Sequence, residues 1–148
     1  MSALSEIELV KEPGVSPAER RFVFLVEDDC DDAELLVEAF RELSPSYTVV
    51  CLNSADQLFS RLNAALPEDM PCLIITDLNI PIVNGISILN QLARHERYSS
   101  IPRIVYSHSS NPQDQQSSFN AGARIYLRKP NTIAEIRRNV LQMLEYCN

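Results

Sequence analysis

The chain has 148 residues, 45% of them hydrophobic, and a formal net charge of −7 at pH 7. This length suits one domain with a substantial core, and the acidic balance argues against nucleic acid as a partner, because phosphate backbones are bound by clustered Lys and Arg. No stretch is long and apolar enough for a membrane span, and the first residues lack a signal-peptide pattern. We therefore expect a cytoplasmic protein without a membrane partner.

The N-terminal part of the chain divides into an extension and the start of a fold. Residues 1–20 carry mixed charge, two prolines and little periodicity, so we expect a loosely ordered extension before a domain spanning residues 21–148. The apolar run at 22–26 predicts a first strand that is buried on both faces. Asp31 or Asp32 can cap the helix that follows.

The middle of the chain repeats this alternation of strand and helix. Tyr47–Leu52 predicts a second strand, and Ser54 with Gln57 forms a capping box that opens a helix. The apolar run at 72–76 predicts the central strand. An Asn-Gly pair at 84–85 marks a turn before the next amphipathic helix.

The last third adds two more units. Arg103–Ser107 predicts a fourth strand, and an Asn-Pro pair at 111–112 opens a helix that Gly122 ends. A short fifth strand is expected at 125–127, followed by a helix that begins near Thr132. Five alternating units with short connections imply parallel strands with right-handed crossovers, so the sequence predicts a doubly wound α/β domain with five strands and five helices.

Polar side chains follow four of the predicted strands. Because the carboxyl ends of parallel strands meet in one crevice, these groups should converge there. They are Glu27, Asp28, Asp29, Asp77, Ser107 and Lys129. Carboxylates, a hydroxyl and an ammonium in one crevice indicate a site for a divalent cation and a phosphoryl group.

Each group has a chemical use in such a site. Glu27 and Asp28, with Asp77, supply the hard oxygen ligands that hydrated Mg²⁺ prefers. Asp77 at the tip of the central strand would be repelled by the other carboxylates unless a cation lies among them, and its carboxylate can attack phosphorus to form an acyl phosphate. Lys129 can hold phosphoryl oxygens as a point charge, and Ser107 can donate a hydrogen bond to one of them.

Less specific interpretations compete at several positions. An acidic run is often a solvated helix start, and we prefer that interpretation for Asp31 and Asp32. Asp77 could instead be a loop residue that caps a turn. His108 lies near the crevice and could carry a proton or contact a partner, whereas His95 resembles a solvated helix end.

The four cysteines form no Cys-x-x-Cys pair and have no His at metal-ligand spacing. Cys51 and Cys72 lie in apolar runs, so we expect both to be small core residues. The carboxylates beside Cys30 disfavour its thiolate, so we expect an unreactive thiol there.

Taken together, four segments closely resemble the receiver domain of two-component response regulators, and the match runs from about Arg21 to the C-terminus. They are Leu-Val-Glu-Asp-Asp at 25–29, Ile-Ile-Thr-Asp-Leu-Asn-Ile-Pro at 74–81, Ile-Val-Tyr-Ser at 104–107 and Tyr-Leu-Arg-Lys-Pro at 126–130. The resemblance implies a flavodoxin-like strand order of 2-1-3-4-5 and a stand-alone, single-domain regulator.

The resemblance also implies a role for each site residue. Glu27 and Asp28 match the acidic pair that binds magnesium, and Asp77 matches the phosphoacceptor. Asn79 matches the residue whose backbone carbonyl completes the metal shell. Lys129 matches the phosphate-binding lysine.

Two further positions match the switch of the family. Ser107 matches the hydroxyl that follows the phosphoryl group, and Tyr126 matches the aromatic residue that then swings inward. Output would run to the surface of the fourth helix, fifth strand and fifth helix. The family often has a cis bond at the position of Lys129-Pro130. The chain departs from the family pattern at Asn131, His108 and Asp29.

The resemblance implies a phosphorylation-controlled signalling protein whose only catalysis is formation and hydrolysis of its own acyl phosphate. The phosphoryl donor would be a sensor histidine kinase, which for stand-alone receivers is sometimes of the phytochrome type. We expect a monomer or weak homodimer. Terminal output and relay to another histidine protein remain open, and a magnesium-dependent phosphohydrolase is a less favoured alternative because no segment supplies a cap.

Overall fold

The computed structural model describes residues 21–147, so the extension expected at residues 1–20 lies outside the described residues. Five parallel strands form a single sheet in the order β2-β1-β3-β4-β5, which confirms the predicted doubly wound α/β architecture. The strands are β1 (Arg21–Val26), β2 (Tyr47–Leu52), β3 (Leu73–Thr76), β4 (Arg103–Ser107) and β5 (Ile125–Arg128).

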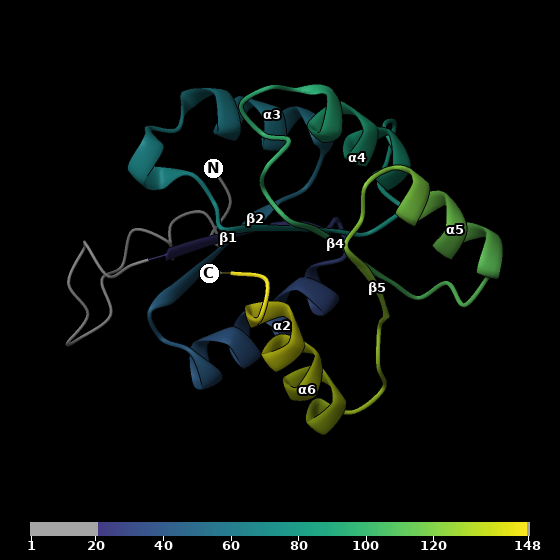
Figure 1. Ribbon diagram of the computed structural model, residues 1–148. Coiled ribbons are helices and arrows are strands. Elements are labelled where there is room, and N and C mark those ends of the chain that lie inside the picture. The colour runs from purple at the N-terminus through teal and green to yellow at the C-terminus, as the bar shows by residue number, and fades with distance from the viewer. Residues whose placement is uncertain (1–20, 148) are drawn as a thin grey trace.

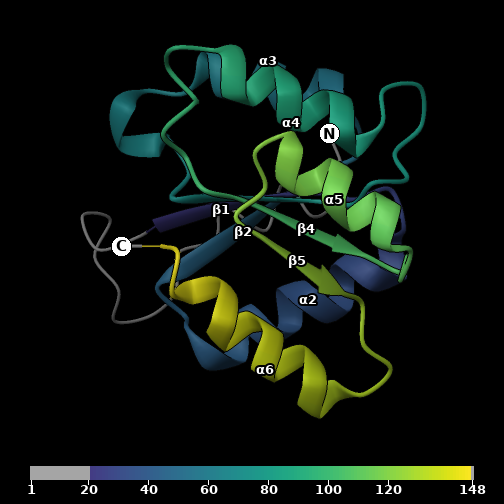
Figure 2. The same cartoon turned by 45° about the vertical axis from the view of Figure 1, so that its right-hand side comes forward.

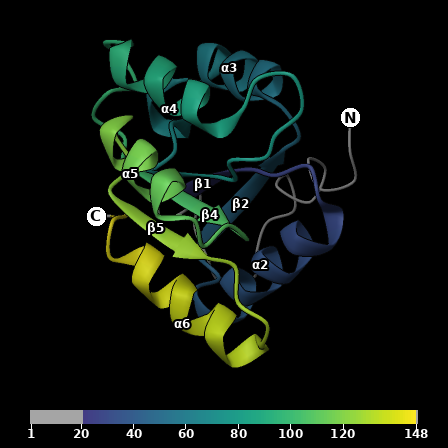
Figure 3. The same ribbon diagram turned by 90° about the vertical axis from the view of Figure 1, so that its right-hand side faces the viewer.

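Helices cover both faces of the sheet. They are α2 (Cys30–Leu43), α3 (Ala55–Ala64), α4 (Gly85–Arg94), α5 (Pro112–Asn120) and α6 (Ile133–Leu144), with a short 3₁₀ turn η2 (Pro67–Asp69) before β3. In Figure 1, α2 and α6 lie below the sheet, whereas α3, α4 and α5 lie above it. The rotated views in Figure 2 and Figure 3 show the same three layers.

The apolar run of β1 fills both cores. Val23 and Leu25 pack in the cluster that includes residues of α2 and α6, whereas Phe24 and Val26 pack in the cluster that includes residues of α3 and α4. Successive strand residues point to opposite faces, so a strand covered on both faces must be apolar at every position. Both layers therefore hold β1 in place and position the residues at its carboxyl end.

The cap of α2 differs from the prediction. Asp29, with extended backbone angles, is the N-cap residue, and its Oδ1 accepts a hydrogen bond from the backbone N–H of Asp32 at 3.1 Å. The proposed caps Asp31 and Asp32 lie instead in the first turn, because the helix begins directly at Cys30. The first turn of α2 lies at the end of the sheet that carries the polar residues, because it follows the carboxyl end of β1.

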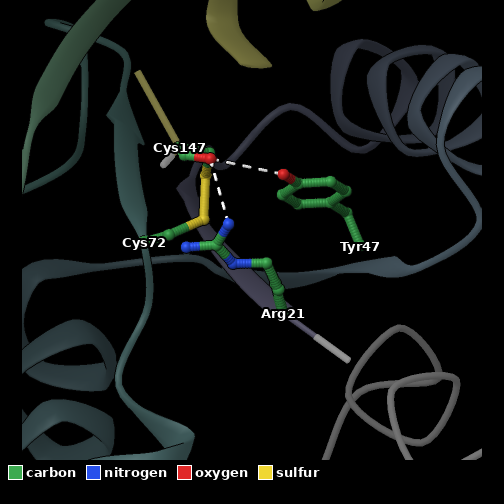
Figure 4. Close-up of a disulfide and its surroundings, with 4 residues drawn as sticks. All are labelled: Arg21, Tyr47, Cys72 and Cys147. Atoms are coloured by element: carbon green, nitrogen blue, oxygen red, sulfur yellow. Dashed lines mark hydrogen bonds between the residues drawn. A yellow bond between two sulfur atoms is a disulfide. The ribbon is translucent and has the colours of Figure 1, made fainter. Parts of the chain in front are cut away.

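A disulfide corrects the prediction for Cys72. Cys72 and Cys147 are bonded across 75 positions of sequence, with their Cα atoms 5.1 Å apart. Figure 4 shows that the Cys147 carbonyl also accepts hydrogen bonds from Arg21 Nη1 and Tyr47 Oη, at 3.2 and 3.3 Å. Their spacing carries no motif, and only the fold brings the start of β3 to the end of α6. Cys51 is buried in the core, as predicted.

No helix within residues 21–147 has the length and apolar character needed to cross a bilayer.

Candidate functional site

Backbone hydrogen bonds extend the sheet one residue beyond the strands and fix the site residues. The Glu27 N–H donates to Leu52 O at 2.9 Å, and the Asp77 N–H donates to Val26 O at 3.1 Å. These bonds hold the first residue after β1 beside the first residue after β3. On the other side, the Lys129 N–H donates to Ser107 O at 2.7 Å. The predicted convergence at the carboxyl ends of the strands is therefore present for these residues.

The Lys129 ammonium lies at the centre of the site. Its Nζ is 2.8 Å from Asp77 Oδ2, 2.8 Å from Asp32 Oδ2 and 2.5 Å from Glu27 Oε1. The Lys129 side chain is only 3% exposed. Burial alone would lower the pKa of Lys129, but the three carboxylates raise it above its ordinary value, so Lys129 is a permanent cation here.

The two oxygens of Asp77 have different environments. Oδ1 accepts hydrogen bonds from the N–H groups of Leu78 and Asn79, at 2.7 and 3.3 Å. Oδ2 faces Lys129 Nζ. The backbone thus fixes the orientation of the carboxylate and presents one particular oxygen to the cation.

Gly85 lets the start of α4 approach Asp77 closely. A Cβ at this position would lie 2.3 Å from Asp77 O, and the Gly85 N–H donates to Leu78 O at 3.0 Å. The Asn-Gly pair that the sequence marked as a turn therefore also packs against the backbone of the site, with Asn84 as the N-cap of α4.

Glu27 is nearly buried beside two other charged groups. Its Oε2 accepts a hydrogen bond from the Asp29 N–H at 3.2 Å. Burial raises the pKa of Glu27 to about 7, and Asp77 adds repulsion, although Lys129 opposes both effects. A proton or a cation at this position therefore removes a charge that the protein interior disfavours.

The carboxylates are arranged around an ammonium and do not form a ready-made metal cage. Within residues 21–147, no three His, Cys, Asp or Glu side chains are grouped at ligand spacing, and Asp28 is exposed. The donor chemistry nevertheless fits a hard divalent cation, because the buried carboxylates of Glu27 and Asp77 already converge on one positive charge.

Ser107 and Tyr126 are joined through a residue that sequence reasoning missed. The buried Ser107 Oγ accepts a hydrogen bond from the Ser109 N–H at 3.2 Å, and Tyr126 Oη donates to Ser109 O at 2.8 Å. The two predicted switch residues thus contact opposite sides of one peptide segment. No motif marks Ser109, because its contribution is made entirely by its backbone.

Asp32 was assigned to a solvated helix start, and that interpretation is wrong. Its Oδ2 accepts a hydrogen bond from Lys129 Nζ and lies 3.1 Å from His108 Nε2. Burial would raise the pKa of Asp32, but Lys129 and His108 bring it below its ordinary value. The misplaced cap explains the error, since a helix that begins at Cys30 turns Asp32 into the crevice.

The Lys129-Pro130 peptide is trans, as are the other peptide bonds within residues 21–147. The resemblance had suggested a cis bond, so this expectation is wrong.

This crevice lies at the carboxyl ends of a parallel sheet in the order 2-1-3-4-5, the arrangement of a doubly wound α/β domain. The chain belongs to the response regulator receiver domain family, whose sequence model matches residues 23–141. The resemblance and the fold inferred from it are therefore confirmed.

Particular relatives give the scale of the similarity. The chain is 30% identical to the probable methanogenesis regulatory protein FilR2 of Methanothrix harundinacea, over 84% of this chain and 81% of that protein. It is also 30% identical to the transcriptional regulatory protein PrrA of Mycobacterium tuberculosis, over 82% of this chain but only 49% of PrrA.

Among solved structures, the phosphorylated cyanobacterial phytochrome response regulator RcpA is similar at 25% identity, with a TM-score of 0.77, over 86% of this chain and 94% of that chain.

Proposed function

We propose that Asp77 is the phosphoacceptor of this receiver and takes its phosphoryl group from a sensor histidine kinase. The observation that carries the proposal is the asymmetric environment of Asp77, in which two backbone N–H groups hold Oδ1 and Lys129 lies 2.8 Å from Oδ2. A fixed carboxylate with one oxygen beside a buried cation suits attack on an anionic phosphoryl donor.

The reaction is a displacement at phosphorus. Asp77 Oδ2 forms a bond to the phosphorus of a phosphohistidine, and the phosphorus–nitrogen bond breaks. The electron pair of that bond stays on the imidazole nitrogen, which takes a proton from water. Lys129 balances the charge of the phosphoryl oxygens. Water then cleaves the acyl phosphate slowly, which regenerates the carboxylate and releases inorganic phosphate.

A divalent cation, in the family role of Mg²⁺, would be held by Glu27, Asp28, Asp77 and the backbone carbonyl of Asn79. When bound, it offsets negative charge on the carboxylates and on the phosphoryl oxygens. Solved neighbours support binding of a divalent cation, although they do not test which residues hold it. One is the Mn²⁺-bound form of the response regulator Rcp1, and another is the receiver domain of PA1611 with magnesium in its active site cleft.

Output would run through Ser107 and Tyr126. In the unphosphorylated structure, the Ser107 hydroxyl accepts a hydrogen bond from the Ser109 N–H, and Tyr126 Oη donates one to the Ser109 carbonyl. A phosphoryl group on Asp77 would attract the Ser107 hydroxyl away from the Ser109 N–H. Breaking the first contact therefore loosens the second and changes the surface of α5, β5 and α6. This is a two-state element biased by a local charge change.

The partner class follows from the family. The similarity to RcpA makes a phytochrome-type kinase a specific candidate for the phosphoryl donor. We expect a monomer or a weak dimer that tightens on phosphorylation, because the surface of α5 and α6 mixes exposed apolar residues such as Phe119 and Ile133 with charged ones such as Arg137.

The direct test is phosphorylation by acetyl phosphate and MgCl₂, followed by intact mass measurement. The wild-type protein should gain one phosphoryl group, and Asp77→Asn should gain none. Asp31→Asn is the matched control, because it removes an exposed carboxylate of the same kind. Full labelling of Asp77→Asn would refute the assignment, and repeated release of phosphate from small esters would indicate a phosphohydrolase instead.

A further inference from the structure

One carboxylate oxygen links three separate segments at the mouth of the site. Asp32 Oδ2, in the first turn of α2, lies 2.8 Å from Lys129 Nζ and 3.1 Å from His108 Nε2. Lys129 follows β5, and His108 follows β4. The position of Asp32 is itself fixed, because its N–H donates to the cap residue Asp29.

All three N–H donors of the Lys129 ammonium have a carboxylate partner before Asp77 Oδ2 bonds to phosphorus. An incoming phosphoryl oxygen can therefore bind Lys129 at that stage only by displacing one of them. The side chains of Glu27 and Asp77 are 2% and 8% exposed, whereas that of Asp32 is 21% exposed. A released carboxylate must be solvated, and water reaches Asp32 most readily. The Asp32 contact is therefore the one that is broken at least cost.

The same oxygen also restrains the switch segment. His108 directly follows Ser107, so a shift of Ser107 toward a phosphoryl group on Asp77 moves the backbone that carries His108. Any such shift changes the distance between His108 Nε2 and Asp32 Oδ2, which is 3.1 Å here. Phosphorylation thus requires two events, release of Lys129 and movement of Ser107. Both affect contacts that the Asp32 carboxylate makes.

We propose that Asp32 is a positioning residue that restrains the site in its unphosphorylated arrangement by holding Lys129 and His108 with a single oxygen. This inference rests on the proposed function. Glu27 and Asp77 keep Lys129 in place without Asp32. Loss of Asp32 therefore removes the restraint but leaves Lys129 positioned to hold phosphoryl oxygens. Loss of its charge also reduces repulsion of an incoming anion.

The test measures affinity for beryllofluoride, a phosphoryl mimic, at saturating Mg²⁺ by calorimetry. Asp32→Ala should bind beryllofluoride roughly fivefold more tightly than wild type. This factor corresponds to the loss of one partly exposed ion pair at the upper end of the usual range of energies. Asp32→Asn, which keeps an oxygen acceptor but loses the charge, should fall between the two. Asp31→Ala, in the same turn, should match wild type and control for net charge.

A spectroscopic readout separates restraint from a merely structural role. The ring ¹⁵N signals of His108 should shift when the mimic binds to wild type, because the contact with Asp32 breaks, and should stay unchanged in Asp32→Ala. Unchanged or weaker mimic binding in both Asp32 variants would overturn the inference. Absence of mimic binding in wild type would instead refute the proposed function of Asp77.

Discussion

Removal of the disulfide should weaken the fold at the end of the sheet opposite the site. Cys72 immediately precedes β3, and Cys147 lies beyond the end of α6, so the bond ties the C-terminal helix to the central strand. Cys147→Ser removes this covalent link while leaving its neighbours unchanged. The hydrogen bonds from Arg21 and Tyr47 to the Cys147 carbonyl would then remain.

The magnitude follows from the length of the loop that the bond closes. A sequence separation of 75 residues corresponds to about 4.5 kcal/mol in the chain-entropy model, within the range of about 2–5 kcal/mol for loss of native disulfides. For a protein of this size, such a change lowers the melting temperature by roughly 15 °C. A dithiol reductant should destabilise wild type by the same amount and leave Cys147→Ser unaffected.

Urea unfolding with and without reductant measures the change, and Cys30→Ser is the matched control because Cys30 is exposed and outside the bond. Thiol titration of the denatured, unreduced protein provides an independent check, since two of the four cysteines should react. Four reactive thiols, or equal stability with and without reductant, would refute the reasoning.

Three further results are expected. Asp28→Ala should lower Mg²⁺ affinity in a calorimetric titration, and unchanged affinity would exclude Asp28 from the metal shell. The pKa of Glu27 in the folded protein is about 7, above its ordinary value of 4.5. Its contribution to stability without metal is therefore fully present below pH 4.5 and is lost as pH rises toward 7. The free energy of unfolding of the wild type should decline over this range, whereas that of Glu27→Gln should not show this decline. Ser107→Ala should still accept a phosphoryl group on Asp77 but lose phosphorylation-dependent association by sedimentation; association equal to wild type would rule out the route through Ser107.

The fold could be predicted because local patterns and packing agree along most of the chain. The apolar run of β1 indicates burial on both faces, and both cores use it. The caps Ser54, Asn84, Asn111 and Thr132 accept the hydrogen bonds that their positions suggest. Gly122, expected to end α5, has a φ of 109°, which suits a residue without a side chain.

The site was only partly predictable. Glu27, Asp77, Ser107 and Lys129 follow strand ends, so the sheet alone places them together. Asp32, Ser109 and the disulfide depend on helix phase, on a backbone conformation and on contact between distant segments, and none of these has a local signature. An acidic residue in the first turn of a helix satisfies the helix dipole whether it faces water or Lys129.

The balance of charge explains why a cation and a phosphoryl group should act in sequence at this site. Lys129 balances one of the three carboxylates around it, and the other two remain uncompensated except where Glu27 takes a proton. A divalent cation would balance those two, and only then can a phosphoryl group add its charge without strong repulsion. The resting site therefore favours cations over anions, and burial, with repulsion from Asp77, raises the pKa of Glu27 even beside a permanently charged lysine. Asp32 holds the outermost of these charges, so its release toward water is the step by which the site makes room for the phosphoryl group.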